Sequence, residues 1–420
     1  MIYLDNSATT PLDPNVAEAM QPYLAAKFGN ASSIYSLGRE ARMALEDART
    51  IVAAAIGADP AEIVFTSGGT EANNQAIKGT IFEAVKKGKR FDELSVLTSG
   101  AEHHAVLEPV AFLESLGVKA DLIGVDTEGA VEPQSIKKIN SGNPTLACFM
   151  LVNNEVGTIN PVKEIVRLAH SVGALAYVDA VHYGPHGLID VAALDCDFLV
   201  CSTYKFFGPH MGVLFGKRKH LQRLRPYKVR PLTDAVPNRW EWGTLNHECI
   251  AGITACVEYI ADLGRGLTDG PANTRVPHPS RLSKGGNDAA DTSGVSERRA
   301  AIAAAYQAIH EHERGLLQRM VTGLAKIPRP KIYGITDPAR FHERCATLAV
   351  RIENHTPLEL ATKLGDRSIF TWDGNYYALN LTEQLDVEKS GGFVRIGLVH
   401  YNTPEEVDRL LQELSEIVGT

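Results

Sequence analysis

The feature of this sequence that most constrains its fold is a regular alternation of short apolar runs and amphipathic segments. Helical periodicity of apolar residues occurs in residues 15–56 and again between the later runs, as in HAVLEPVAFLESLG and VKEIVRLAHSVG. Strands that alternate with helices predict an α/β fold with a parallel or mixed sheet covered on both faces. Ligands of such sheets bind beyond the carboxyl ends of the strands. The expected strands are EIVFTSG, ELSVLTS, KADLIGV, TLACFMLVNN, ALAYVDA, DFLVCST and MGVLFGK.

The composition changes near residue 264, which predicts a domain boundary. Residues 264–297 are rich in Gly, Pro, Ser, Asn and Asp and poor in large apolar side chains, so we expect a long mobile loop there. The sequence before it divides into an N-terminal arm (1–14) and a large ligand-binding domain (15–263). A helical stretch followed by short mixed segments predicts a smaller α+β domain over 298–420.

Charge and composition exclude several classes of function. The net charge is −8 with Lys and Arg scattered along the chain, which argues against a nucleic-acid-binding protein. The N-terminus has no pattern of a signal peptide, and no apolar run approaches the length of a membrane span. The six cysteines form no C-x-x-C pair, so the spacing does not indicate a metal site and favours reduced thiols in a cytoplasmic protein.

One lysine stands where lysines are seldom placed. Lys205 lies in CDFLVCSTYKFFGPHMGVLF, between two apolar runs and beside an aromatic turn. One interpretation is a side chain whose stem packs on the core while its ammonium group reaches water. The other is a lysine that forms an imine with a carbonyl cofactor.

A glycine-containing turn precedes one of the predicted helices. In TSGGTEANN, Gly69 and Thr70 stand where backbone N–H groups at a helix N-terminus can bind a phosphate. An ordinary capped helix explains the turn equally well. The turn has no Gly-Lys-Ser/Thr sequence, so it is not a nucleotide-binding P-loop.

Two adjacent histidines, His103 and His104, open another predicted helix in AEHHAVLEP. They are compatible with helix capping or with an exposed surface. The alternative is that one flat imidazole stacks on an aromatic cofactor ring.

Polar residues end several of the predicted strands. Asp179 ends an almost wholly apolar run, and a buried carboxylate is costly without a cation or hydrogen-bond donors. A buried Asp that accepts backbone hydrogen bonds is the simpler alternative. Together with Asn154, Ser202 and Lys205, however, Asp179 can surround a planar phosphorylated cofactor. Pyridoxal 5'-phosphate (PLP) requires a lysine, donors for its phosphate and a carboxylate that keeps its ring nitrogen protonated.

The ensemble of motifs resembles the cysteine desulfurase branch of the class V aminotransferases, which are fold type I PLP enzymes. The similar stretches follow the family's order from residue 3 to about residue 410. The second half also resembles a subset usually labelled cysteine desulfurase-like. The resemblance implies a three-layer α/β/α large domain with a mainly parallel sheet, a small C-terminal domain and a homodimer. The stretches are YLDNSATTPLDPNV, FGNASSIYSLGREA, FTSGGTEANN, EHHAVL, VNNEVGTINPV, VDAVH, STYKFFGPHMGVL and VRIGLVHYNTPEEVD.

The resemblance also assigns roles around the cofactor ring. It implies that Lys205 is the Schiff-base lysine, that Asp179 pairs with the pyridine nitrogen and that His103 stacks on the ring. Asn154 and His182 would approach the phenolic oxygen. His182 departs from the family pattern, which usually has glutamine at this position.

The same resemblance implies contacts to the phosphate and the substrate. Thr244 matches a threonine that reaches the phosphate from the partner subunit, and Arg395 matches the arginine that binds the substrate α-carboxylate, a task suited to a bidentate guanidinium. A surface ion pair is the alternative for Arg395. Asn375 and Tyr377 are expected to contact the substrate. The phosphate would be held by Gly69, Thr70, Ser202 and Tyr204, the last of which replaces a frequent histidine.

The main departure from the family is a missing cysteine. Desulfurases of this family attack sulfur with a loop cysteine shortly before the carboxylate-binding arginine, but residues 370–395 contain no cysteine, and Tyr377 stands at or near that position. A phenol, with a pKa of about 10, does not take up sulfur as a persulfide. Cys345 is expected at the start of a core strand, where a buried thiol is usually inert.

The sequence therefore predicts a PLP enzyme and leaves its reaction open. The first hypothesis is cleavage of the C–S or C–Se bond of L-cysteine or a relative, by desulfuration with a free acceptor or an unknown acceptor protein, or by β-elimination. The second is aminotransfer or epimerisation of another amino acid. The third is an inactive PLP-binding scaffold.

Overall fold

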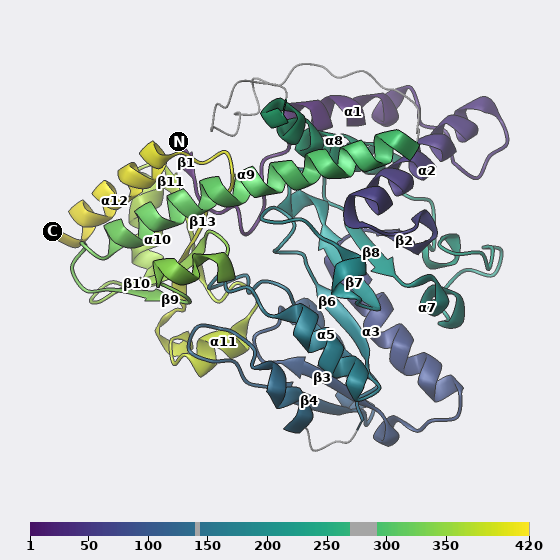
Figure 1. Cartoon of the computed structure of the whole chain (residues 1–420), viewed down its shortest axis with the longest axis horizontal. Helices are drawn as coiled ribbons and strands as arrows, with labels where there is room; N and C mark the ends of the chain where they lie inside the picture. Colours follow the sequence, from purple (N-terminus) through teal and green to yellow (C-terminus); the bar gives the residue numbers. More distant parts are fainter. Residues whose placement is uncertain (139–142, 269–291, 420) are drawn as a thin grey trace.

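The computed structural model describes residues 1–138, 143–268 and 292–419. Its large domain is built on a seven-stranded sheet in the order β2-β8-β7-β6-β5-β3-β4 (Figure 1). All seven predicted runs are strands, and the α/β class is confirmed. Only β8 runs antiparallel to its neighbours β2 and β7 among these strands. The bounds are β2 Ile63–Thr66, β3 Ser95–Ser99, β4 Lys119–Ile123, β5 Leu146–Met150, β6 Leu175–Asp179, β7 Phe198–Ser202 and β8 Gly212–Gly216.

Helices cover both faces of this sheet, which explains why most of its strands are buried at every position. One face packs on α3 (Gly69–Lys86) and α4 (His104–Ser115). The other face packs on α1 (Pro14–Ala25), α2 (Ser36–Ile56), α5 (Val162–Ser171) and α8 (His247–Thr268). The short helix α6 (Val191–Leu194) lies between β6 and β7 in the chain, and α7 (Arg218–Arg223) follows β8.

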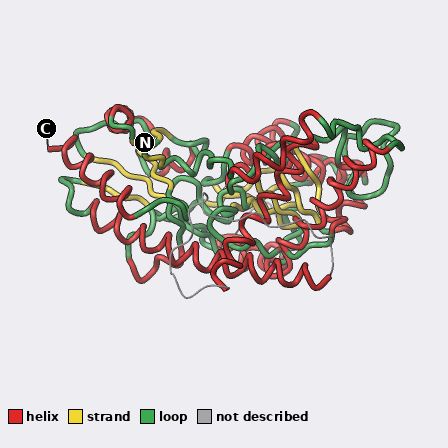
Figure 2. Tube along the Cα trace, turned by 90° about the horizontal axis from the view of Figure 1, so that it is seen from above, coloured by secondary structure: helices red, strands yellow, loops and turns green. Residues whose placement is uncertain are grey.

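A second, smaller sheet forms the C-terminal domain and lies apart from the first sheet (Figure 2). The strands of this sheet are antiparallel, in the order β12-β13-β10-β9. Its core includes residues of two long helices, α9 (Thr292–Leu324) and α12. Among the described residues, no helix has the length and apolar character needed to cross a membrane. The elements are β9 Pro330–Tyr333, β10 Thr347–Ile352, α10 Pro357–Asp366, β12 Trp372–Gly374, α11 Leu379–Gln384, β13 Phe393–Gly397 and α12 Pro404–Gly419.

The N-terminal arm joins this second domain. Strand β1 (Ile2–Tyr3) pairs in parallel with β11 (Ile369–Phe370), and Leu4 is buried in the core of the small domain. The arm then continues toward the carboxyl ends of the large sheet, where Thr10 donates to the carbonyl of Tyr204.

The expectation of a loop over 264–297 needs correction at both ends. Helix α8 continues to Thr268, and α9 (Thr292–Leu324) begins within the predicted loop; residues 269–291 lie outside the described residues. The predicted boundary at residue 298 therefore falls inside a continuous helix. Helix α9 packs on α8 and α2 of the large domain and on α12 of the small domain, so it spans both (Figure 1).

Candidate active site

The candidate site lies where three parallel strands end. Strands β5, β6 and β7 are neighbours, and their register pairs Met150 with Asp179 and Asp179 with Val200. Their carboxyl ends therefore meet at one edge of the sheet. A short 3-10 turn, Thr203–Lys205, follows β7 directly and positions Lys205 at this edge.

Lys205 is partly buried and faces the N-terminal arm. Its Nζ atom donates a hydrogen bond to the carbonyl of Ser7 and lies 5.3 Å from the centre of the Tyr204 ring. Removal from water and the nearby Arg395 lower the pKa of Lys205 to about 7, although Asp5 and Asp179 act in the opposite direction. The amine is therefore substantially neutral at physiological pH, as a nucleophile or proton acceptor requires.

Asp179 is the last residue of β6 and is only 7% exposed. Burial raises the pKa of Asp179 to about 6, while the N–H of Val181, 2.9 Å from Oδ1, favours the ionised form. The simple prediction of a buried Asp that accepts a backbone hydrogen bond is thus correct for one oxygen. Asn73 and Lys205 also favour the ionised carboxylate and so act against the effect of burial on the pKa of Asp179.

His103 caps helix α4, because its Nδ1 accepts the N–H of Ala105 at 2.9 Å. Burial first, and then Lys205, His104 and Arg395, lower the pKa of His103 to about 4. The ring is therefore neutral and carries its proton on Nε2. Capping and ring stacking are compatible, since the cap uses only one edge of the imidazole.

Arg395 lies in β13 of the small domain and is 2% exposed, so the alternative of a surface ion pair is wrong. Its Nη2 atom lies 3.1 Å from Oδ1 of Asp5, and its Nη1 donates to the carbonyl of Asn154 at 3.2 Å. The guanidinium also lies 4.1 Å from the centre of the Tyr376 ring. Burial raises the pKa of Asp5 even though the arginine acts against this shift.

Several buried polar atoms of this region have no hydrogen-bond partner within the described chain. Oδ1 of Asn154, Nδ1 of His182 and Oγ of Ser202 are such atoms. Unpaired buried polar atoms are rare and often mark the place of a ligand. A Cβ added to Gly69 would lie 3.0 Å from Oγ of Ser202, so the N-terminus of α3 is next to that hydroxyl. The set of orphaned atoms, the helix N-terminus and Lys205 fit a phosphorylated carbonyl cofactor such as PLP.

Thr70, Tyr204 and Thr244 are the other residues that the sequence predicts to bind the phosphate. Thr70 is exposed in the first turn of α3, and the ring of Tyr204 stacks on His210 at 4.9 Å. Thr244 is exposed and accepts a hydrogen bond from Asn30 at 3.4 Å.

The loop before Arg395 contributes residues to the mouth of the site. Tyr377 is 61% exposed, and its ring centre lies 5.7 Å from that of His103. Its carbonyl accepts the N–H of His104. Asn375 instead donates to Glu388 at 3.1 Å, which directs its amide into the loop itself.

The sequence analysis assigned no role to three residues that complete the site. Asp5 and Ser7 in the N-terminal arm contact Arg395 and Lys205, and Oγ1 of Thr347 lies 2.9 Å from Oγ of Ser7. The motif YLDNSATTP contains two of them, but only the fold reveals that this arm crosses the site. Thr347 is an ordinary strand residue in the sequence and gives no signal.

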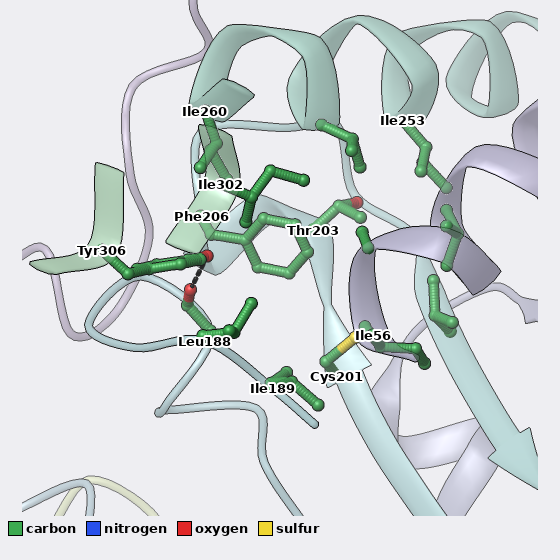
Figure 3. A pocket seen from close by; sticks show the side chains of 15 residues that line it. Ile56, Leu188, Ile189, Cys201, Thr203, Phe206, Ile253, Ile260, Ile302 and Tyr306 are labelled. Atoms are coloured by element: carbon green, nitrogen blue, oxygen red, sulfur yellow. Dashed lines mark hydrogen bonds between the residues drawn. The ribbon is translucent and has the colours of Figure 1, made fainter. Parts of the chain in front are cut away.

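An apolar cavity, lined among others by Thr203 and Phe206 of the segment that carries Lys205, is distinct from this polar site. It is enclosed by α2, α8, α9 and the end of β7, and the hydroxyl of Tyr306 at its rim donates to the carbonyl of Gly184 at 2.6 Å (Figure 3). Its lining is almost entirely aliphatic, including Ile56, Ile253, Ile260 and Ile302. Such a lining does not suit a phosphorylated cofactor.

Comparisons with known proteins identify the family that the chain resembles over nearly its whole length. A family model described as Aminotransferase class-V matches residues 2–267 and 273–410. A cysteine desulfurase IscS from Methanosarcina thermophila is 33% identical over 431 residues, covering 99% of this chain and 92% of that protein. A cysteine desulfurase IscS from Dictyoglomus turgidum is 43% identical over 260 residues, which span 61% of this chain and 63% of that protein.

A solved structure shows the same architecture. The apo cysteine desulfurase from Thermococcus onnurineus NA1 superposes with a TM-score of 0.82 at 26% identity, covering 100% of this chain and 94% of that one. The family of these relatives depends on PLP. With a family match over nearly its whole length, the chain belongs to the class-V aminotransferase family and is similar to its cysteine desulfurases.

Proposed function

We propose that this chain is a PLP-dependent enzyme that cleaves the C–S or C–Se bond of L-cysteine or a related small amino acid. The observation that carries the proposal is the position of Lys205 in the turn directly after β7, in a region where buried polar atoms of Asn154, His182 and Ser202 have no partner. When bound, PLP supplies an electron sink for negative charge at the substrate α-carbon. The remaining tasks fall to side chains of this chain.

Lys205 would hold the cofactor and then move a proton at the substrate α-carbon, since a pKa of about 7 allows it to accept and return protons at neutral pH. Asp179 would pair with the pyridine nitrogen, and neutral His103 would lie against the ring. Asn154 and His182 would approach the phenolic oxygen, where Nδ1 of His182 is unpaired, whereas the amide N–H of Asn154 donates to the carbonyl of Tyr376 at 3.0 Å.

Further side chains would hold the cofactor phosphate and the substrate carboxylate in place. The phosphate would bind Gly69, Thr70, Ser202 and Tyr204 at the N-terminus of α3. Arg395 would bind the substrate carboxylate in place of part of its contact with Asp5. A fork-shaped guanidinium orients a carboxylate through two hydrogen bonds, which suits positioning of the α-carbon.

We also propose that the active unit is a homodimer in which Thr244 of one copy reaches the phosphate of the other. Thr244 is exposed on its own chain. Mixing a Lys205→Ala chain with a Thr244→Ala chain would create mixed dimers with one intact site. Tight PLP binding should recover in the mixture; no recovery would show that each site is complete within one chain. The free thiols of the six cysteines are compatible with the cytoplasmic location that we propose.

The fate of the sulfur separates two candidate reactions. No cysteine follows Cys345 in the sequence, and the exposed Tyr377 next to His103 does not accept sulfur as a persulfide. Desulfuration would therefore need a free thiol or an acceptor protein. The same observation favours β-elimination to pyruvate, ammonia and sulfide as the second candidate.

Product analysis distinguishes these reactions. The PLP-loaded protein is mixed with L-cysteine, with and without a thiol reductant, and the products are quantified. Alanine plus sulfide identifies a desulfurase, whereas pyruvate, ammonia and sulfide identify a lyase. If neither set forms, cysteine is not the substrate, and aminotransfer, epimerisation or a non-catalytic scaffold replaces the proposal.

A further inference from the structure

A buried cluster of nitrogen and sulfur ligands lies beside the candidate site. The side-chain ligand atoms of His182, His186 and Cys345 all lie within 4.8 Å of one another, and each of these residues is 4% exposed. Sγ of Cys345 is 3.9 Å from Nε2 of His182. This is the only such group of three or more His, Cys, Asp or Glu found in the part of the chain that the structure describes.

The geometry is close to that of a tetrahedral zinc site. Zinc binds sulfur at about 2.3 Å and imidazole nitrogen at about 2.0–2.1 Å, so tetrahedral S and N ligands lie about 3.6 Å apart. The observed separation of Cys345 and His182 exceeds that value by only a few tenths of an ångström. Shifts of less than about 1.5 Å bring the other atoms to the same spacing. Two imidazoles and one thiolate form a donor set that suits a borderline-soft divalent ion.

An outer carboxylate already orients one of these imidazoles. Oε2 of Glu313, on α9, lies 2.8 Å from Nδ1 of His186. This contact fixes the tautomer that leaves Nε2 free for a metal, as in the carboxylate–histidine pairs of zinc sites. Glu313 is 4% exposed, and its second oxygen has no partner among the described residues.

Charge and access also support binding of an ion. A thiolate and the Glu313 carboxylate together carry two negative charges, which balance the two positive charges of a divalent cation. The adjacent Arg344 directs its guanidinium to the carbonyl oxygens of Val156, Ile335 and Thr347. His186 lines an open hollow of about 330 Å³ between α9 and the turn that follows β6, which gives an ion a route from solvent.

We propose that His182, His186 and Cys345 bind one Zn²⁺ ion, with Glu313 orienting His186 and a water molecule completing the coordination. The ligands come from both domains, since the histidines follow β6 and Cys345 precedes β10. The ion therefore links the two domains beside the candidate cofactor site, which His182 also borders. Cysteine spacing alone gives no sign of this site because its ligands lie in two distant segments of the sequence.

The test measures zinc in the full-length chain, independently of turnover and with PLP content determined separately. Metal-free protein is incubated with Zn²⁺, passed through a desalting column and examined by elemental analysis. We expect one retained zinc per chain in the wild type and less than a tenth of that in Cys345→Ser and His186→Gln. Cys249→Ser, on α8, and His310→Gln, in the hollow on α9, serve as matched controls and should retain the ion.

Equal zinc retention in Cys345→Ser and Cys249→Ser, or none in the wild type, would overturn the proposal. X-ray absorption of the zinc-loaded wild type identifies the zinc ligands directly, so this test holds even if the substituted chains fail to fold. A single Zn–S distance of about 2.3 Å together with Zn–N distances of about 2.0–2.1 Å is expected. A spectrum with oxygen and nitrogen ligands only would exclude Cys345 and the site.

Discussion

Asp5 and Arg395 stand 390 residues apart in the sequence and form an ion pair with 3.1 Å between Oδ1 and Nη2. The pair links the N-terminal arm to β13 and holds the guanidinium beside the ends of the large sheet. A substrate carboxylate that binds Arg395 has to compete with Asp5 or share the guanidinium with it. This relationship connects the fold directly to substrate binding.

The first prediction concerns Arg395. Arg395→Ala should raise KM for the amino-acid substrate by about tenfold or more, because a hydrogen bond to a charged group is worth about 1.5–3 kcal/mol. Arg395→Lys keeps the charge but loses the fork, so it should restore only part of the affinity. Arg319→Ala, at an exposed ion pair on α9, is the control. Steady-state kinetics that show an unchanged KM in Arg395→Ala would remove this residue from the site.

The second prediction follows from the pKa of Lys205 at about 7. Only the neutral amine captures PLP, so the capture rate of cofactor-free protein should rise by about tenfold from pH 6 to pH 8 and then level off. An ordinary lysine would give a rise of about a hundredfold with no plateau in this range. Stopped-flow absorbance at a series of pH values provides the measurement.

Asp5→Asn sharpens this pH test. The negative charge of Asp5 favours the protonated Lys205, so its removal should lower the pKa of Lys205 and move the midpoint of PLP capture to lower pH. Asp408→Asn, which removes a charge from the exposed pair with Arg319, should leave the midpoint in place. A midpoint that rises in Asp5→Asn would contradict the arrangement of charges described here.

The structure shows why only part of this site was predictable from the sequence. Asp179 and Ser202 end largely apolar strands and Lys205 follows in the next turn, and neighbouring parallel strands bring such ends together. The arm with Asp5 and Ser7 was not predictable as part of the site, because its pairing with residues near 369 is a long-range contact without a local pattern. The continuation of α8 and α9 into residues 264–297 was missed because polar, Gly-containing sequence resembles a loop even where helix packing stabilises a helix.

A third prediction separates the two roles of His103. His103→Asn keeps an N-cap side chain but removes the ring, so it should weaken PLP binding with little loss of stability. His103→Phe keeps a flat ring but removes the cap, which should lower the free energy of unfolding by about 1 kcal/mol. PLP titration and chemical denaturation of both variants provide the readouts. If both variants bind PLP as tightly as the wild type, the ring of His103 does not contact the cofactor.

A fourth prediction concerns the support of the phosphate turn. Arg49, 1% exposed, binds both oxygens of Glu241 at 2.8 and 3.0 Å, and Glu241 accepts the N–H of Phe65 just before that turn. Glu241→Gln removes the buried counter-charge of Arg49 and leaves only the half-exposed Glu46 at 3.3 Å, so it should lower the free energy of unfolding by about 3–5 kcal/mol. Asp408→Asn, at an exposed pair, should leave it unchanged. Urea denaturation that shows equal stability for the two variants would contradict this account.

The central claim is that Lys205 holds PLP, and covalent trapping tests it most directly. The PLP-loaded protein is reduced with borohydride, digested, and its modified peptide is identified by mass spectrometry. The account predicts a pyridoxyl group on Lys205 and the loss of both the adduct and the cofactor absorbance in Lys205→Ala. An adduct on another lysine, or full cofactor absorbance in Lys205→Ala, would contradict it.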